Sequence, residues 1–271
     1  MRSGWIALVS VSLLLGACAS HDNRDELTEA LYYQKAHKLL VKQHYDEAIS
    51  DLKELEARFP YSDYAEQAQL ELVYAYYQTS DFANLVASAQ HFISNYPASQ
   101  QIDYVLYLQG LGNYRLTESV FERFFKRDLA ARDLSAKRDA FNNFAELVRR
   151  FPDSQYAPDA RSRMVYIRQL LAENDLEVAR YYAKREAYIA SANRAQNIVQ
   201  HFQGTPQVEE ALAILSRCYT ELKQPELAAK SRAVLAYNWP HSAFLGADDK
   251  VDIDWWPQGA NWLDLLTFDL L

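Results

Sequence analysis

Phe151-Pro152-Asp153-Ser154 is one copy of a four-residue pattern that recurs along this chain: an aromatic residue, proline and, two positions later, serine. The other full copies are Phe59-Pro60-Tyr61-Ser62, Tyr96-Pro97-Ala98-Ser99 and Trp239-Pro240-His241-Ser242, and Phe202-Gln203-Gly204-Thr205 is a degenerate copy. Successive aromatic residues are 37, 55, 51 and 37 positions apart. Two of these spacings fit one period in the mid-thirties, and the other two fit that period with 18 and 14 extra residues.

Similar residues precede each copy at fixed distances. Eleven positions before the aromatic residue stand Ala48, Leu85, Ala140, Ser191 and Ala228, and four positions before it stand Leu55, Phe92, Leu147, Ile198 and Leu235. Positions seven apart share one face of a 3.6-residue helix, so each copy predicts an amphipathic helix that ends at the aromatic residue. Another recurring position lies 23 residues before the aromatic residue of each copy. It is occupied by Ala36, Val73, Ala179 and Ser216, and by Asp128 in the third copy. These residues predict a preceding helix, so that each copy forms a helical hairpin, with the first helix of the third copy displaced by the insertion.

This unit resembles the tetratricopeptide repeat, in which small residues let paired helices approach closely. Proline stops the second helix and serine supplies an N-cap for the next. We therefore expect an all-α fold, a right-handed tetratricopeptide-repeat solenoid of about five helical hairpins that stack to bury one continuous core. An irregular all-helical domain with coincidental aromatic-proline stops is the alternative.

The pattern sets approximate helix boundaries. We expect helices over residues 28–43, 45–59, 62–78, 81–95, 100–116, 136–151, 155–172, 175–184, 187–202, 207–222 and 225–238. The extra 14 residues predict a long helix broken at Asn174-Asp175. The other excess falls in residues 117–135, where four basic and four acidic side chains indicate a solvated face, with a binding patch as the alternative.

Composition argues against most catalytic and nucleic-acid-binding classes. The 271 residues carry a formal net charge of −8, whereas a nucleic-acid-binding protein needs a basic face. Only seven glycines occur, no phosphate-binding glycine motif is present, and no histidine or cysteine spacing is typical of a metal site. We expect no enzyme activity, no cofactor, no metal and no nucleic-acid partner.

The first residues indicate a targeting signal. The apolar run from Trp5 to Leu15 is too short to cross a bilayer, which takes about 20 residues, and is typical of a signal peptide. Leu15-Gly16-Ala17-Cys18 resembles a lipobox, so we expect residues 1–17 to be removed and Cys18 to carry lipid; a plain secretory signal is the alternative. Ala19, which is not an aspartate, indicates sorting to the outer membrane by analogy with enteric lipoproteins. Residues 18–27 are expected to be a tether.

Four stretches carry a more specific resemblance: Leu70–Tyr77 (LELVYAYY), Ile102–Gly110 (IDYVLYLQG), Phe144–Tyr156 (FAELVRRFPDSQY) and Val178–Tyr182 (VARYY), the last together with Asn193-Arg194. Over about residues 18–240 the chain resembles the BamD family, lipoprotein subunits of the outer-membrane β-barrel assembly machinery. The resemblance implies a lipid-anchored scaffold at the periplasmic face of the outer membrane. Its implied partners are the barrel-forming subunit BamA, bound through the C-terminal repeats, the companion lipoprotein BamC, other assembly lipoproteins, and unfolded outer-membrane proteins.

Candidate binding residues follow from repeat geometry, since first helices line the concave face of such a solenoid. Tyr64, Tyr74, Tyr77, Tyr104 and Tyr107 fall on the expected first helices of the second and third repeats, where they are candidates for holding an extended, partly apolar segment. Packing in the core is the alternative for each. Asp103 is a candidate acceptor for a substrate N–H or basic side chain, with a helix N-terminal carboxylate as the alternative. We therefore expect residues 28–152 to face substrate and residues 153–242 to face the assembly partner.

Arg194 is the candidate for partner binding, because the family has at this position an arginine that faces the barrel subunit. Its guanidinium can take a carboxylate bidentately; pairing within its own chain is the alternative. Cys218 lies in a helical apolar pattern and is expected to be a core thiol. The tail, 243–271, ends in an amphipathic stretch over residues 260–271 that we expect to form a capping helix on the last repeat, with a docking peptide as the alternative.

Two other functions stay open at this stage. One is a lipoprotein assembly factor for a pilus or secretin, which would share lipobox and fold. The other is a periplasmic hydrolase, for which the sequence has no GxSxG motif.

Overall fold

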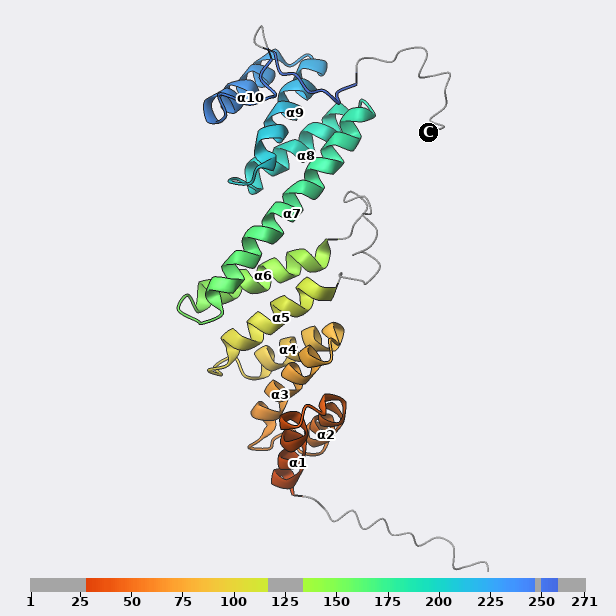
Figure 1. The fold of residues 1–271 in the computed structure, drawn as a ribbon, viewed down its shortest axis with the longest axis vertical. Coiled ribbons are helices and arrows are strands. Elements are labelled where there is room, and N and C mark those ends of the chain that lie inside the picture. Colours follow the sequence, from red (N-terminus) through yellow and green to blue (C-terminus); the bar gives the residue numbers. More distant parts are fainter. Residues whose placement is uncertain (1–27, 117–133, 247–249, 258–271) are drawn as a thin grey trace, which may run out of the picture. The chain divides into compact units, whose positions relative to one another are not determined.

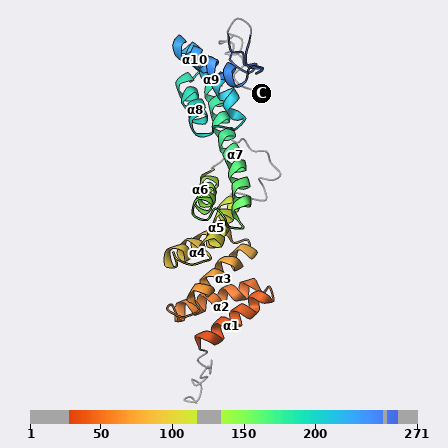
Figure 2. The same cartoon turned by 90° about the vertical axis from the view of Figure 1, so that its left-hand side faces the viewer.

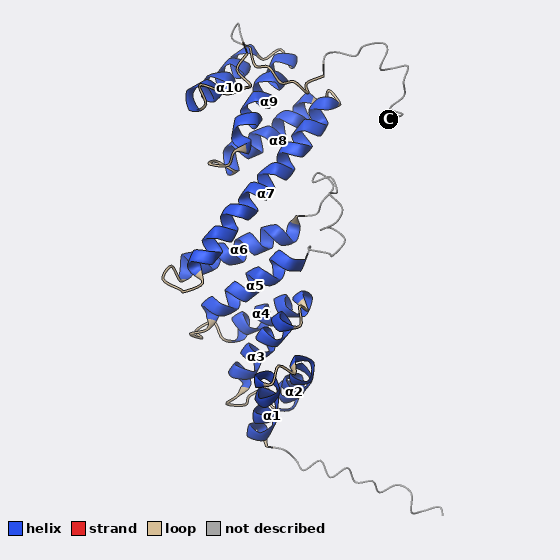
Figure 3. Cartoon of the chain, in the orientation of Figure 1, coloured by secondary structure: helices blue, strands red, loops and turns tan. Residues whose placement is uncertain are grey.

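The computed structural model describes residues 28–116, 134–246 and 250–257, and in this part of the chain the fold is all-α (Figure 1 and Figure 3). The chain divides into two compact units, residues 1–75 and 76–271, which are described separately. The predicted signal peptide, Cys18, the tether, residues 117–133 and the expected helix over 260–271 lie outside the described residues. No helix of the described part combines the length and the apolar character needed to span a bilayer.

The described part of the chain contains ten helices. The first unit contains α1 (Glu29–Val41) and α2 (Tyr45–Arg58), and α3 (Ala65–Gln78) begins in it. The second unit contains α4 (Phe82–Asn95), α5 (Ile102–Leu116), α6 (Ser135–Arg150), α7 (Ala157–Lys184), α8 (Tyr188–His201), α9 (Gln207–Glu221) and α10 (Pro225–Asn238). In the first unit α1 packs against α2, and in the second unit each helix from α4 to α10 packs against the next one, so the predicted class, an all-α repeat solenoid, is confirmed.

The recurring four-residue pattern makes the same turn each time. Each aromatic residue donates its backbone N–H to the carbonyl four positions earlier and accepts from the N–H three positions later, as in Phe151 with Leu147 and Ser154. In the four full copies the serine hydroxyl then accepts from the N–H two positions on, at 3.0–3.2 Å. The serine thus caps the turn that leads into the next element, about three residues before the α-helix itself begins where one follows.

A second turn recurs between the two helices of a hairpin. Gln43, Ser80, Glu186 and Lys223 all have a left-handed backbone, with φ between 57° and 64°. In each case the following residue donates its N–H to the carbonyl five positions earlier, which satisfies a carbonyl at the end of the helix. This glycine-poor chain therefore uses non-glycine residues at four positions where glycine has no steric cost.

The predicted core positions are buried. The residues four positions before each aromatic residue are all 0% exposed: Leu55, Phe92, Leu147, Ile198 and Leu235. Of those eleven positions before it, Ala48, Leu85, Ala140 and Ser191 are 0% exposed and Ala228 is 8% exposed. At Gly110 on α5, an added Cβ would lie 2.5 Å from the Phe144 ring of α6. Close helix approach therefore depends on these small residues.

The predicted break at Asn174-Asp175 is wrong, because α7 runs without interruption from Ala157 to Lys184. Both residues are buried, and the Asp175 carboxylate accepts hydrogen bonds from Arg194 and Asn197 of α8. Asp175, which the sequence analysis interpreted as part of a helix break, thus makes a contact between α7 and α8. Figure 1 and Figure 2 show α7 extending from α6 to α8 and α9, both of which pack against it.

The last repeat is covered by an irregular segment. Phe244 and Asp252 are joined by a backbone hydrogen bond, and Leu245 and Val251 form an isolated antiparallel bridge. Val251, Ile253 and Trp256 are buried in the same apolar cluster as residues of α8 and α9. Among the described residues, the segment that packs on the last repeat is therefore extended chain that ends before residue 258.

Candidate functional site

The first unit holds two of the predicted tyrosines on α3 and the loop before it. Tyr64 stacks on Tyr33 of α1 with ring centroids 4.9 Å apart, and Tyr33 stacks in turn on His37. The Tyr33 hydroxyl donates to Glu71 Oε1 at 2.8 Å, and His37 Nδ1 lies 2.9 Å from the same oxygen. Burial, followed by the Glu71 carboxylate, raises the pKa of Tyr33, so the hydroxyl stays protonated and donates.

Tyr74 meets a shallow pocket beside this stack. Its ring packs edge-on against Tyr45 of α2, with centroids 6.2 Å apart. The pocket has a volume of about 320 Å³. It is lined by His37, Leu40, Val41, Gln43, Tyr45, Glu71 and Tyr74. The first unit therefore offers half-buried aromatic rings around a hollow that ends on a buried carboxylate.

The second unit brings together Tyr104, Tyr107 and Tyr156. Tyr156, which precedes α7, stacks on Tyr107 at 4.9 Å and lies 5.4 Å from Tyr104, both on α5. The Tyr107 hydroxyl donates to Asp159 Oδ2 at 2.8 Å, and burial, then this carboxylate, raises the pKa of Tyr107 to about 12. Burial opposes ionisation of Asp159, but Arg163 and Tyr107 outweigh it and lower the pKa of that carboxyl. Sequence reasoning missed Tyr156, although it stands two residues after the recurring serine.

Asp103 is engaged within the chain. Its Oδ2 accepts from the Ser154 hydroxyl at 2.6 Å, which ties the start of α5 to the turn before α7. Oδ1 lies 2.7 Å from the N–H of Tyr104. These contacts are those expected of a carboxylate near a helix N-terminus, and the role of Asp103 toward a substrate stays a prediction. Tyr77, the remaining predicted residue, is half-buried in the last turn of α3.

Arg194 also has a partner in its own chain. Its Nη1 lies 3.3 Å from Asp175 Oδ1, while Asn197 Nδ2 donates to Asp175 Oδ2 at 2.7 Å. The Asp175 side chain is 5% exposed and that of Arg194 is 49% exposed. The guanidinium therefore neutralises a buried carboxylate and still presents about half of its surface to solvent. Ile189, earlier on the same helix, is 66% exposed.

A cluster around Arg180 joins α7, α9 and the C-terminal segment. Arg180 pairs with Glu210 of α9 and with Glu173 and Glu177 of its own helix. The Trp255 indole N–H donates to Glu210 Oε1 at 3.2 Å. Trp256 stacks on Tyr188 of α8 with an interplanar angle of 9°. The sequence analysis placed both tryptophans in the C-terminal tail and predicted no contact for them. The hydrogen bond from Trp255 to Glu210 could not be predicted from the residues around Trp255, because Glu210 is 45 positions away.

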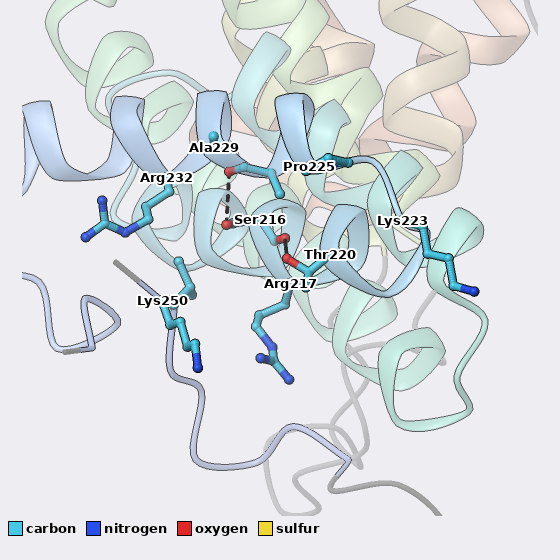
Figure 4. A pocket seen from close by; sticks show the side chains of 10 residues that line it. Ser216, Arg217, Thr220, Lys223, Pro225, Ala229, Arg232 and Lys250 are labelled. Atoms are coloured by element: carbon cyan, nitrogen blue, oxygen red, sulfur yellow. Dashed lines mark hydrogen bonds between the residues drawn. The ribbon is translucent and has the colours of Figure 1, made fainter. Parts of the chain in front are cut away.

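Cys218 is fully buried and burial raises the pKa of its thiol to about 11, so the expected core thiol is confirmed. In the described ranges no three His, Cys, Asp or Glu side chains are grouped so as to hold a metal ion. A pocket of about 720 Å³ lies between α9, α10 and Lys250-Val251 (Figure 4).

Comparison with known proteins gives a consistent family. A family model described as "Outer membrane lipoprotein", YfiO, matches residues 25–235. A protein named outer membrane protein assembly factor BamD from Neisseria meningitidis serogroup A is 41% identical over 256 residues, which cover 92% of this chain and 96% of the relative. Proteins of the same name from Pasteurella multocida and Haemophilus influenzae are 37% and 35% identical, each over 86% of this chain and 89% of their own length.

Proposed function

The chain belongs to the YfiO family of outer membrane lipoproteins, and from this membership we propose that it is an outer membrane protein assembly factor that works as a scaffold, without catalysis. The shared name of the relatives supports this role. It favours β-barrel assembly over a pilus or secretin, since no relative reported above carries a name of that kind. The repeat solenoid is suited to the role because stacked hairpins offer extended surfaces to other chains.

Anchoring is proposed through Cys18. A diacylated and N-acylated cysteine would hold the chain at the periplasmic face of the outer membrane, since stable anchoring takes more than one acyl chain. Replacing Cys18 with serine should release the chain from the membrane fraction. Retention of the variant in washed outer membranes would contradict the anchor.

The proposed substrate is an unfolded outer-membrane protein, held by the repeats over residues 28–152. The observation that supports this is the state of the predicted tyrosines: each side chain is half-buried, so part of it stays accessible to a bound segment. Such rings give contact area at small cost in side-chain entropy. Because the hydroxyls of Tyr33 and Tyr107 are already bonded to Glu71 and Asp159, the rings rather than the hydroxyls would contact the bound segment.

Site-specific photocrosslinking in intact cells tests substrate binding. A photoreactive phenylalanine analogue at Tyr64, Tyr74 or Tyr104 should form adducts with newly secreted barrel proteins. The matched control is Tyr61, a ring that is 99% exposed and stands only three residues from Tyr64. Equal adduct yields from Tyr61 and Tyr64 would show that any surface aromatic residue suffices and would contradict a specific role of the predicted tyrosines in substrate binding.

The proposed partner surface lies on the repeats over residues 153–242 and centres on Arg194. BamA would place a carboxylate against the exposed part of the guanidinium, while Ile189 contributes apolar contact. BamC and other assembly lipoproteins are proposed as further partners. Co-purification from solubilised membranes checks these partners, and the Arg194 variants described in the Discussion separate a partner contact from an internal one.

A further inference from the structure

The pocket between α9 and α10 combines an apolar floor with a cationic rim. Its volume is about 720 Å³, and its floor contains Pro225, Ala228, Ala229 and Val251. Its lining includes four cationic side chains, Arg217, Lys223, Arg232 and Lys250, and among the described residues no acidic side chain lines it. In a chain with a net charge of −8, this concentration of positive charge on a single pocket is unusual.

The two hydroxyl groups that line the pocket are already hydrogen-bonded within the chain. Ser216 donates to the carbonyl of Ala228 at 3.1 Å, and Thr220 donates to the carbonyl of Ser216 at 2.9 Å. Figure 4 shows both hydroxyls turned to these carbonyls and the four cationic side chains spread around the pocket. What the pocket offers a ligand is therefore positive charge and apolar surface.

Arg217 links the pocket to the C-terminal segment. Its guanidinium lies 5.4 Å from the centre of the Trp256 ring and 3.4 Å from the Glu221 carboxylate. Its Nε is buried and makes no hydrogen bond in the described structure. The last described residues, Trp256 and Pro257, thus lie beside the same side chain that lines the pocket.

We propose that this pocket binds residues 258–271 of the same chain. This segment contains Asp264 and Asp269, no lysine, arginine or histidine, and the apolar residues Trp262, Phe268 and five leucines. Its charge and its apolar content complement the rim and the floor of the pocket. Fourteen residues span up to about 46 Å extended, or about 21 Å as a helix, so reach from Pro257 does not limit docking. A segment tethered in this way has an effective concentration of the order of millimolar, which favours it over a free acidic peptide.

Intramolecular crosslinking in the purified full-length lipoprotein tests the proposal. A photoreactive phenylalanine analogue replaces Phe268, a change from one aromatic ring to another. The expected adducts join it to residues 216–232 within one chain, at a yield that does not depend on protein concentration. Adducts only between two copies, only to an added partner, or to another face of the chain would overturn the proposal.

Charge variants show whether the rim holds the segment. Lys250→Glu should reduce the adduct yield by about threefold or more, because a favourable charge pair becomes a repulsive one. The matched control is Lys230→Glu, an exposed residue of α10 that does not line the pocket, and it should leave the yield unchanged. Asp269→Lys added to Lys250→Glu should restore the yield. If Lys250→Glu alters the melting temperature, Lys223→Glu at the other side of the pocket replaces it. Equal yields in the rim and control variants would refute the electrostatic docking.

Discussion

The hydroxyl of Ser191 on α8 donates a 2.9 Å hydrogen bond to the backbone carbonyl of Ala179 on α7. Both residues are 0% exposed, at the point where the two helices of this hairpin meet. In the next hairpin the arrangement is reversed, since Ser216 of α9 donates to the carbonyl of Ala228 on α10 at 3.1 Å. A buried serine is thus accommodated on either helix of a hairpin, because a backbone carbonyl of the other helix accepts its hydrogen bond.

This contact predicts a strong dependence on side-chain size. Ser191→Leu should lower the free energy of unfolding by roughly 1–3 kcal/mol through overpacking, whereas Ser191→Ala, which loses one hydrogen bond, should cost about 1 kcal/mol or less. Urea unfolding followed by far-UV circular dichroism measures both. Asn193→Leu, at an exposed position of the same helix, is the control and should change stability little. Equal effects of leucine at 191 and 193 would show that the contact is loose.

Gly110 makes a second close contact whose effect runs against helix propensity. Replacing glycine by alanine inside a helix normally stabilises by up to about 1 kcal/mol. At Gly110 the new Cβ would lie 2.5 Å from Phe144 Cε1, so we expect Gly110→Ala to destabilise by roughly 1–3 kcal/mol. Phe144→Leu in the same chain should relieve part of this loss, visible as a favourable coupling energy in a double-mutant cycle. Strictly additive effects would mean that the ring moves aside without cost.

The left-handed turns predict a reversal of the usual order of alanine and glycine. At Glu186, where φ is 59°, Glu186→Gly should be more stable than Glu186→Ala by about 0.5–1 kcal/mol, since only glycine avoids the steric cost of this conformation. At Ala233, an exposed interior position of α10, Ala233→Gly should instead lose about 1 kcal/mol. Thermal unfolding of the four chains gives both comparisons. The same order at both positions would contradict the assigned turn.

Tyr107 predicts a loss of stability in alkali. Its pKa is raised to about 12 in the folded chain, from about 10 when unfolded, so its contribution is present below pH 10 and is lost as the pH rises toward 12. The difference in unfolding free energy between the wild type and Tyr107→Phe should therefore shrink over that interval. Lysine deprotonation affects both chains alike and cancels in the difference. Tyr61→Phe, at the 99% exposed ring, is the control. A constant difference for Tyr107→Phe from pH 9 to 12 would count against the hydrogen bond from Tyr107 to Asp159.

Arg194 predicts a result that separates its two contacts. Arg194→Glu should reduce co-purification with the barrel-forming subunit by about tenfold or more, as expected when one partner of a close charge pair is reversed, while the far-UV helical signal is kept. Because Arg194 also pairs with Asp175, Asp175→Asn removes the internal ion pair and leaves the exposed guanidinium in place. Asp175→Asn should keep the partner. An equal loss in both variants would assign the effect to the internal pair, and unchanged co-purification in Arg194→Glu would remove the partner role.

The repeats were predictable from the sequence because their signals are local. The spacing of the aromatic-proline-serine copies, the small residue eleven positions earlier and the apolar residue four positions earlier all act within one hairpin, and the buried positions of Leu55, Phe92 and Ala140 follow from helical periodicity alone. Cys218 was predictable for the same reason. The capping role of the recurring serine was also predictable. Its position was not, because the serine stands about three residues before the α-helix begins and not directly at its start.

The tertiary structure decided which side chains are free to act. Asn174 and Asp175 look like a helix break in sequence, yet α7 continues through both, and α8 supplies two hydrogen-bond donors to the Asp175 carboxylate. Asp103 is held by Ser154, 51 residues away, and Trp255 by Glu210, 45 residues away. Hairpin formation depends on the order of residues over one or two helical turns, which the sequence specifies by itself. Pairing between hairpins depends on which distant side chains the packed helices bring within hydrogen-bond distance, and that is determined only when the chain has folded.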